Sequence, residues 1–101
     1  MPPRFVYDRD KDKLNRKHHG MSLVEGYHVL KGDPRFFMTD LDVDQVEERW
    51  ITIAPHPVIP GLLVVVYHHR NMQDEDTIRL ISVRKATRLE RKAYEERQSQ
   101  S

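Results

Sequence analysis

The pattern of apolar and polar positions predicts a short polar helix near the start of the chain. Asp8 is a suitable N-cap for a helix over residues 9–18, and Gly20 is placed to end it. Leu14 is the one large apolar residue in this stretch. We therefore expect the helix to lie on the surface of the protein.

A second helix is predicted directly after the first. The sequence Ser22-Leu23-Val24-Glu25 has the form of a capping box, in which the serine caps the helix and the glutamate follows three positions later. Leu23, Tyr27 and Leu30 recur at i, i+4 and i+7, which places them on one helical face. Gly32 is expected to end this helix.

Beyond residue 35 the pattern changes to that of β-strands. Strands are expected at 36–39, 49–54, 62–69 and 77–84, with a proline-rich loop at 55–61 and a polar turn at 71–76. The strand at 62–69 is apolar on both faces, which is typical of a central position. The last strand alternates, with Ile78, Leu80 and Ser82 on one side and Thr77, Arg79, Ile81 and Val83 on the other.

The order of the predicted elements indicates an α+β fold. A second capping box, Thr87-Arg88-Leu89-Glu90, begins a charged C-terminal helix whose end, residues 98–101, is expected to fray. We expect a small antiparallel sheet of three to four strands, with two N-terminal helices and one C-terminal helix. Because no repeat or linker divides the chain, residues 1–101 are predicted to form a single domain with a core at about 5–95.

Composition excludes several classes of protein. The chain has 101 residues, of which 38% are apolar and 33% charged, and it contains no cysteine. Its longest apolar run, residues 62–67, is far shorter than the roughly 20 residues that span a bilayer. Residues 1–4 lack the apolar stretch of a signal peptide. We therefore expect a cytoplasmic protein without a membrane anchor, a disulfide or a thiolate nucleophile.

Charge is distributed unevenly along the chain. The formal net charge is +1, but residues 33–48 carry six acidic side chains against one basic side chain. The remaining residues have 16 bases and 10 acids. A moderately basic surface suits a nucleic-acid partner, since neutralising phosphates supplies much of the affinity of such complexes. A mixed, solvated surface is the alternative interpretation.

The histidines do not have the spacing of a metal site. His18–His19 are adjacent on a helix and His68–His69 are adjacent on a strand, so neither pair can direct both rings at one ion. Residues 40–44 resemble the start of a calcium loop, but Gln45 and Ile51 stand where glycine and glutamate are needed. We predict no metal and no other cofactor.

Basic residues gather instead at the ends of the predicted strands. They are Arg49, His68 or His69, Arg70, Arg79 and Arg84. Guanidinium groups on neighbouring strands are suited to hold a phosphodiester and its developing negative charge. A ribonuclease that uses the 2′-OH of RNA as nucleophile also needs proton-transfer groups, for which histidine is suited at neutral pH.

Four blocks of this sequence closely resemble the BrnT toxins of bacterial toxin–antitoxin systems. The blocks are Tyr7-Asp8-x-x-Lys11-x-x-Leu14-Asn15-x-Lys17-x-His19-Gly20-x-Ser22, Glu48-Arg49-Trp50, Leu63-Val64-Val65-Val66-Tyr67-x-x-Arg70 and Ile78-Arg79-x-Ile81-Ser82-x-Arg84-Lys85-Ala86-Thr87-x-x-Glu90-x-x-x-Tyr94. The resemblance extends from about Phe5 to Glu95. Three positions differ from the family pattern: His18 stands for lysine, Gly26 for alanine and His68 for threonine.

The resemblance implies a RelE-like fold and metal-independent cleavage of RNA that arrests growth. It also implies a cognate BrnA-type antitoxin that forms a hetero-oligomer with the toxin. On this hypothesis the catalytic residues are Arg70 and Arg84, which stabilise the phosphorane, and His68 and His19, which transfer protons. The RNA-binding residues are Lys11, Lys17, Arg49 and Arg79.

Two interpretations remain open from the sequence. The first is a toxin that acts as a metal-independent endoribonuclease. The second is a non-catalytic binding module with a toxin fold, which holds an antitoxin and modulates repression of its own operon. Trp50 and Tyr94 are expected to be packing residues in either case.

Overall fold

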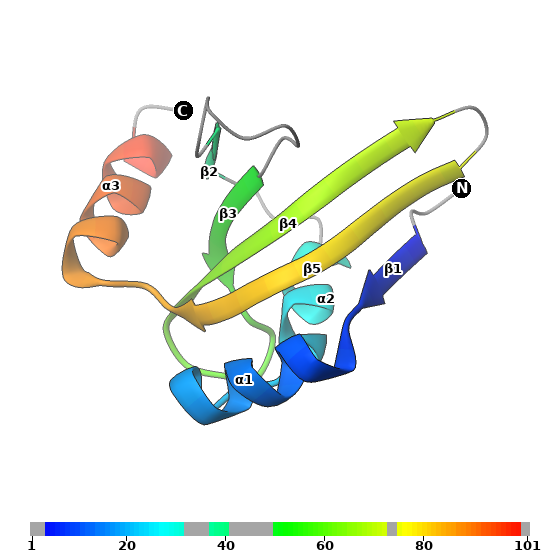
Figure 1. Cartoon of the computed structure of the whole chain (residues 1–101). Coiled ribbons are helices and arrows are strands. Elements are labelled where there is room, and N and C mark those ends of the chain that lie inside the picture. Colours follow the sequence, from blue (N-terminus) through cyan, green and yellow to red (C-terminus); the bar gives the residue numbers. More distant parts are fainter. Residues whose placement is uncertain (1–3, 32–36, 41–49, 73–74, 100–101) are drawn as a thin grey trace.

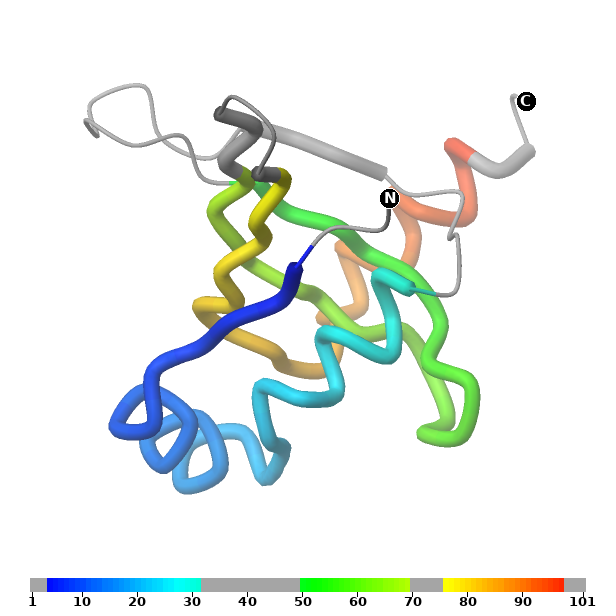
Figure 2. The backbone as a smooth tube through the Cα atoms, turned by 90° about the vertical axis from the view of Figure 1, so that its right-hand side faces the viewer, coloured from blue at the N-terminus to red at the C-terminus, as the bar shows by residue number. Residues whose placement is uncertain are grey.

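The computed structural model describes residues 4–31, 37–40, 50–72 and 75–99. Its elements in chain order are β1 (Arg4–Tyr7), α1 (Arg9–His19), α2 (Val24–Lys31), β2 (Phe37–Asp40), β3 (Trp50–Pro55), β4 (Leu62–Met72), β5 (Glu75–Lys85) and α3 (Arg88–Ser99). The long hairpin of β4 and β5 crosses the molecule, with β1 beside β5 (Figure 1). In Figures 1 and 2, α1 and α2 are neighbours, whereas α3 stands apart from them.

The α+β class and the order of the helices are confirmed, but the expected sheet was wrong in two respects. Within the described residues the sheet has five strands, in the order β1-β5-β4-β3-β2. It is also mixed, because β1 pairs with β5 in parallel, Phe5 opposite Ile78 and Val6 opposite Arg79. The apolar start of the chain is thus a strand, brought to the far edge of the sheet by its pairing with β5.

The hairpin is longer than predicted. A polar turn was expected over residues 71–76, but β4 continues to Met72 and β5 begins at Glu75, with Asn71 opposite Asp76. The ladder of a hairpin consists of hydrogen bonds between backbone groups, so it can continue through residues with polar side chains. Polar residues therefore did not mark the end of these strands. β2 and β3 lie within one residue of the expected bounds, and the structure describes α3 as far as Ser99.

The two faces of the sheet bury separate clusters of apolar residues. We call the face against α2 the inner face; its core includes Leu63, Val65 and Leu80 together with Leu23 and Val29. The outer face carries a smaller cluster of Ile51, Ile53 and Val64. Tyr94 of α3 packs against this cluster, as do Val66 of β4 and Ala86. Trp50 packs against the inner core. Both aromatic residues, Trp50 and Tyr94, are therefore packing residues, as expected.

A β-bulge interrupts the expected alternation of β5. Val66 lies opposite Ser82, whereas the next residue of β4, Tyr67, lies opposite Leu80, so Ile81 is the extra residue. Leu80 and Val83 consequently both belong to the inner core. The prediction that Val83 faces away from Leu80 was wrong, because an alternation read from sequence cannot anticipate an inserted residue.

Leu23, Tyr27 and Leu30, which were predicted to share one face, all lie in or against the inner core. Gly26 and Val29 are the buried residues of α2, while Tyr27 and Leu30 are partly buried at the margin of the core. A Cβ atom built on Gly26 would lie 2.9 Å from Cγ2 of Val83 and 3.0 Å from Cγ1 of Val65. Glycine therefore lets the helix approach the sheet closely.

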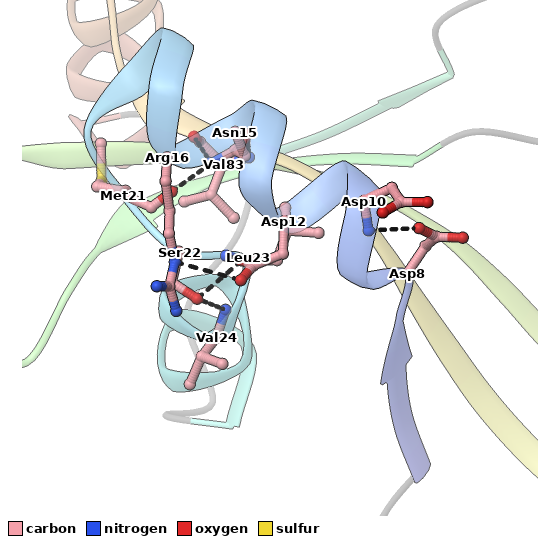
Figure 3. A network of polar contacts seen from close by, with 10 residues as sticks. All are labelled: Asp8, Asp10, Asp12, Asn15, Arg16, Met21, Ser22, Leu23, Val24 and Val83. Carbon is pink, nitrogen blue, oxygen red and sulfur yellow. Dashed lines mark hydrogen bonds and ion pairs between the residues drawn. The ribbon is translucent and has the colours of Figure 1, made fainter.

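The first helix is not a simple surface helix. Its one large apolar residue, Leu14, is 54% exposed, whereas the polar residues Asp12 and Asn15 are buried. Asn15 donates through Nδ2 to the carbonyl oxygens of Met21 and Val83, both at 2.8 Å, and accepts from the N–H of Val83 at 3.1 Å (Figure 3). The amide of Asn15 thus takes the place of a neighbouring strand along the edge of β5, beyond the end of β1.

Asp12 connects α1 to the start of α2. One of its oxygens accepts from the N–H of Leu23 at 2.7 Å and from the hydroxyl of Ser22 at 2.9 Å, and the other pairs with Arg16 at 3.2 Å (Figure 3). Burial acts to raise the pKa of Asp12, but the two hydrogen bonds and Arg16 outweigh it and lower the pKa. Ser22 accepts from the N–H of Val24, as expected of a cap.

The predicted cap of α1 is found, whereas the capping box of α2 differs in one residue. Asp8 accepts from the N–H groups of Asp10 and Lys11, and Gly20 ends α1 in the left-handed conformation with φ of 69°. The carboxylate of Glu25, which was expected to complete the capping box of α2, instead lies 2.9 Å from Nε2 of His56. Glu25 therefore ties α2 to the loop between β3 and β4.

Candidate functional site

The part of the outer face along β5 is the candidate site. Whereas Tyr94 packs over the outer cluster on β3 and β4, the β5 side chains here are exposed or partly exposed. We call this surface the β5 strip and define it as the following residues: Arg79, Ile81, Ser82 and Arg84 of β5, with His68 of β4. The alternation about the inner residues Ile78, Leu80, Val83 and Tyr67 places these residues on the outer face.

Two predicted site residues meet across the hairpin. His68 and Arg79 are directly opposite each other in the antiparallel register of β4 and β5. Arg79 is exposed and His68 is partly buried. Facing residues on one side of a sheet are about 5 Å apart at their Cβ atoms, so an imidazole and a guanidinium are within reach of one bound group.

Arg70 belongs to the same end of the hairpin. It follows His68 by two residues on β4 and lies opposite Thr77. The structure describes its backbone only, and its side chain is outside the described part. Arg49 falls wholly outside the described residues.

Arg84 lies at the other end of the β5 strip. It is opposite Val64, six residues from Arg70 along β4, which corresponds to about 20 Å. The backbone positions of Arg84 and Arg70 are therefore far apart along the hairpin. The structure thus does not bring Arg84 together with Arg70, although the sequence hypothesis had both stabilise one phosphorane.

The guanidinium of Arg84 is bound by Glu90 at the start of α3. Its Nη1 and Nη2 donate to the two carboxylate oxygens at 2.6 and 2.8 Å. Glu90 also completes the predicted capping box, because it accepts from the N–H of Thr87 and donates its own N–H to the Thr87 hydroxyl. Arg84, opposed by burial and assisted by Thr87, lowers the pKa of Glu90 to about 2. Arg84 therefore anchors α3 to the sheet.

A hollow of about 230 Å³ separates α1 from β5, beside the β5 strip. Two predicted site residues, Lys11 and His19, line it. Its other lining residues include Leu14 and His18 of α1, with Ile81 and Ser82 of β5. Lys17 is exposed on the same helix but is not one of the described residues that line the hollow.

Arg79 is also close to the N-cap of α1. The N–H groups of Lys11 and Asp10 lower the pKa of Asp8, and the positive charge of Arg79 adds to their effect. The start of α1 is thus near the end of the β5 strip at which His68 and Arg79 face each other.

Some residues of this region were not anticipated from the sequence. The capping box pointed to Glu90, but nothing in the sequence indicated that its carboxylate would also hold Arg84. Ile81 and Ser82 come to the hollow together because of the bulge, which leaves no sequence signal. The adjacent ring of His69 pairs with Asp76, away from the β5 strip.

Within the described ranges, no three His, Asp or Glu side chains are grouped as a metal site would require. In that same part of the chain, none of the helices has the length and apolar character to cross a membrane.

Comparison with known proteins identifies the family. Among curated proteins, no match to this chain is found. A family model described as the ribonuclease toxin BrnT of type II toxin–antitoxin systems matches residues 7–90. The match includes α1, α2, all of β2 to β5 and the capping box of α3. The chain therefore belongs to the BrnT family of ribonuclease toxins of type II toxin–antitoxin systems.

Proposed function

We propose that this toxin is a metal-independent endoribonuclease of RelE-like fold whose reaction takes place at the His68–Arg79 end of the β5 strip. The observation that carries the proposal is the pairing of these two residues across the hairpin on the open part of the outer face. It puts a proton-transfer group beside a group that binds phosphate. Arg70, two residues farther along β4, is the second proposed cation of this site.

The reaction needs no group beyond those of the RNA and the protein. The 2′-oxygen attacks the neighbouring phosphorus, the bond from phosphorus to the 5′-oxygen breaks, and the products are a 2′,3′-cyclic phosphate and a 5′-hydroxyl end. A base takes the proton of the 2′-OH, and an acid gives a proton to the leaving oxygen. His68 serves as one of these groups. Arg79 and Arg70 stabilise the charge that develops on the phosphorane.

The remaining basic residues have supporting roles in this proposal. Lys11 and Lys17, both exposed on α1, and Arg49 attract the RNA backbone. His19 lines the hollow and is the second candidate for proton transfer. Arg84 acts at the other end of the β5 strip, where its bond to Glu90 leaves it a positioning residue for α3.

The mechanism is tested by cleavage in the presence of excess EDTA. The purified protein should still cleave RNA, and the fragments should carry 2′,3′-cyclic phosphate or 3′-phosphate ends. DNA of the same sequence should stay intact because it lacks the 2′-OH. Activity that disappears with EDTA and returns with magnesium or zinc would contradict the proposal. Antitoxin binding without any cleavage of RNA would favour the non-catalytic module.

The partner of this toxin is proposed to be a BrnA-type antitoxin that covers the β5 strip. Blocking access of phosphate to the strip is the direct way to silence it. When both genes are expressed together, the two proteins should copurify at a fixed ratio and growth should continue. Expression of the toxin alone should arrest growth. A free toxin monomer under co-expression would contradict this part of the proposal.

A further inference from the structure

We propose that the hollow between α1 and β5 binds a single nucleobase of the RNA, next to the cleaved bond, and so determines the sequence preference of the toxin. This inference rests on the proposed ribonuclease function. It assigns a role to the side chains of Leu14, His18, Ile81 and Ser82, which the cleavage mechanism itself does not use.

The apolar part of the hollow is the first argument. Leu14 is 54% exposed, whereas the polar side chains of Asp12 and Asn15 on the same helix are buried. More than half of the surface of Leu14 is thus open at the hollow. Together with Ile81 it gives the hollow an apolar wall against which the flat face of a base can lie.

The polar groups of the hollow are the second argument. Lys11, His18 and His19 stand on its α1 side, and Ser82 offers a hydroxyl from β5. Single-stranded RNA is recognised by packing a splayed base on a side chain, by hydrogen bonds to its edges and by contacts to nearby phosphates. An apolar wall with a hydroxyl, two imidazole rings and the charge of Lys11 provides all three kinds of contact.

The position of the hollow along β5 is the third argument. Arg79 is opposite His68 and Ser82 is opposite Val66, two residues away on β4, which is about 7 Å along a strand. The bulge at Ile81 leaves Ile81 and Ser82 together opposite Val66, and both side chains line the hollow. A phosphate held at Arg79 would thus have the base of an adjacent nucleotide beside the hollow. An apolar side chain of the antitoxin is the competing occupant.

The first test compares the cleavage preferences of two matched variants. Leu14→Ser removes the α1 part of the apolar wall, and Leu89→Ser removes a 79% exposed leucine of α3 that does not line the hollow. Cleavage sites should be mapped on a pool of RNAs with random sequence. We expect Leu14→Ser to flatten the base preference next to the cleaved bond and to raise KM about tenfold with little change in kcat. Leu89→Ser should keep the wild-type preference and KM.

The second test measures binding without cleavage. Trinucleotides with 2′-O-methyl groups and each of the four bases are titrated into the wild-type protein, and NMR follows the Leu14 methyl groups and the His18 and His19 rings. Their shifts should depend on the base, and Ser82→Ala should change which base binds best. Thermal melts of each variant separate a loss of folding from a loss of recognition.

The outcomes distinguish this inference from the proposed function. If the wild type cleaves RNA but Leu14→Ser keeps its preference and KM, the inference is wrong and the ribonuclease function stands. If the wild type does not cleave RNA, the ribonuclease proposal fails, and absence of base-dependent shifts at Leu14 would then also overturn the inference. Shifts that appear only on adding the antitoxin would assign the hollow to protein docking and overturn the nucleobase site.

Discussion

The two faces of the sheet are covered in different ways. On the inner face, α2 approaches β4 and β5 closely enough that Gly26 leaves no room for a Cβ atom. The neighbouring helix α1 is held by Asn15 and Asp12, which are 6% and 8% exposed. On the outer face, α3 packs through Tyr94, and its start is held by an ion pair between Arg84 and Glu90 that is about a quarter to a third exposed.

This difference indicates which polar residues serve folding and which are left for binding. Buried hydrogen-bonding groups are costly to leave unpaired, so the contacts of Asn15 and Asp12 are structural. Exposed cations contribute little to stability. The charge of exposed Arg79 contributes to the fold through Asp8 at the N-cap of α1, where it helps to lower the pKa of that carboxyl. Because an exposed charge adds little stability, Arg79 is available for the RNA-binding role proposed above.

The largest effect on stability is expected from Asn15→Asp. The substitution keeps the size of the side chain but replaces its N–H donors with a second oxygen, which would face the carbonyl groups of Met21 and Val83. We expect a loss of about 3 kcal/mol in the free energy of unfolding, measured by urea denaturation. The control is Lys13→Ala, an exposed position on the same helix. Equal losses in the two variants would show that Asn15 does not hold α1.

A smaller loss is expected from Gly26→Ala. Alanine is favoured over glycine by about 1 kcal/mol in a helix interior. At this position its Cβ would lie 2.9 Å from Val83 and 3.0 Å from Val65, both of which are branched and stiff at χ1. Overpacking of this kind costs about 1–3 kcal/mol, so we expect a net destabilisation of about 1 kcal/mol.

Whether the close approach causes the Gly26→Ala effect can be tested with a double-mutant cycle. If it does, Val83→Ala should relieve part of the cost of Gly26→Ala, and the two effects should not add. Strict additivity, or a gain in stability from Gly26→Ala alone, would show that the helix can move away from the sheet without cost.

Local features of this fold could be predicted from the sequence, whereas contacts between distant elements could not. Asp8, Gly20 and the Thr87–Glu90 box mark helix ends because capping depends on neighbours within four residues. The parallel pairing of β1 with β5 joins residues more than 70 positions apart, and no local pattern reports it. The helical spacing of α2 likewise predicted the face of Leu23, Tyr27 and Leu30, but not the close approach of Gly26 to β4 and β5.

The candidate site could be predicted only in part for the same reason. Arg79 and His68 were singled out as basic residues near strand ends, and their pairing follows from the hairpin register. Arg84 was given the same role because the strand register was not known from the sequence. In the structure Arg84 is opposite Val64, which is six residues away from Arg70 on β4. The polar side of α1 was interpreted as solvent-exposed, since asparagine and aspartate are mostly exposed in proteins. In the structure they are buried because they form hydrogen bonds with backbone groups, Asn15 with the carbonyl of Val83 and Asp12 with the N–H of Leu23.

On the outer face, the Arg84–Glu90 pair should make stability depend on pH. The pKa of Glu90 is about 2 in the folded protein against an ordinary value of 4.5, so the stabilisation is complete above pH 4.5 and is lost as the pH falls toward 2. Glu90→Gln should therefore lower the free energy of unfolding by about 1–2 kcal/mol at pH 7, an amount reduced by partial exposure of the pair. The difference between the variant and the wild type should shrink steadily below pH 4.5.

Urea denaturation at pH 7, 4 and 3 measures this dependence, and Glu95→Gln on the same helix is the matched control. Glu95 is exposed, so its replacement should change stability little at any of the three pH values. A difference for Glu90→Gln that stays constant from pH 7 to pH 3 would show that the glutamine variant loses packing or capping rather than the ion pair.

The smallest effect on stability, together with a large effect on activity, is expected from Arg79→Lys. Lysine keeps the positive charge, so attraction of RNA should hardly change, but it lacks the planar fork that gives two parallel hydrogen bonds to a phosphate. We expect the cleavage rate to fall about 10²–10³-fold, as on removal of one donor to a developing oxyanion. The free energy of unfolding should change by less than about 0.5 kcal/mol because Arg79 is exposed.

Two other arginines extend this comparison. Arg70→Lys should behave in the same way as Arg79→Lys. Arg84→Lys should lower the melting temperature more and the cleavage rate less, because Arg84 is bound to Glu90. Cleavage assays in EDTA and thermal melts, with Arg91→Lys on α3 as the control, measure both quantities. Full activity of Arg79→Lys would remove this residue from the site, and a large drop in its melting temperature would instead make it part of the structure that holds the face together.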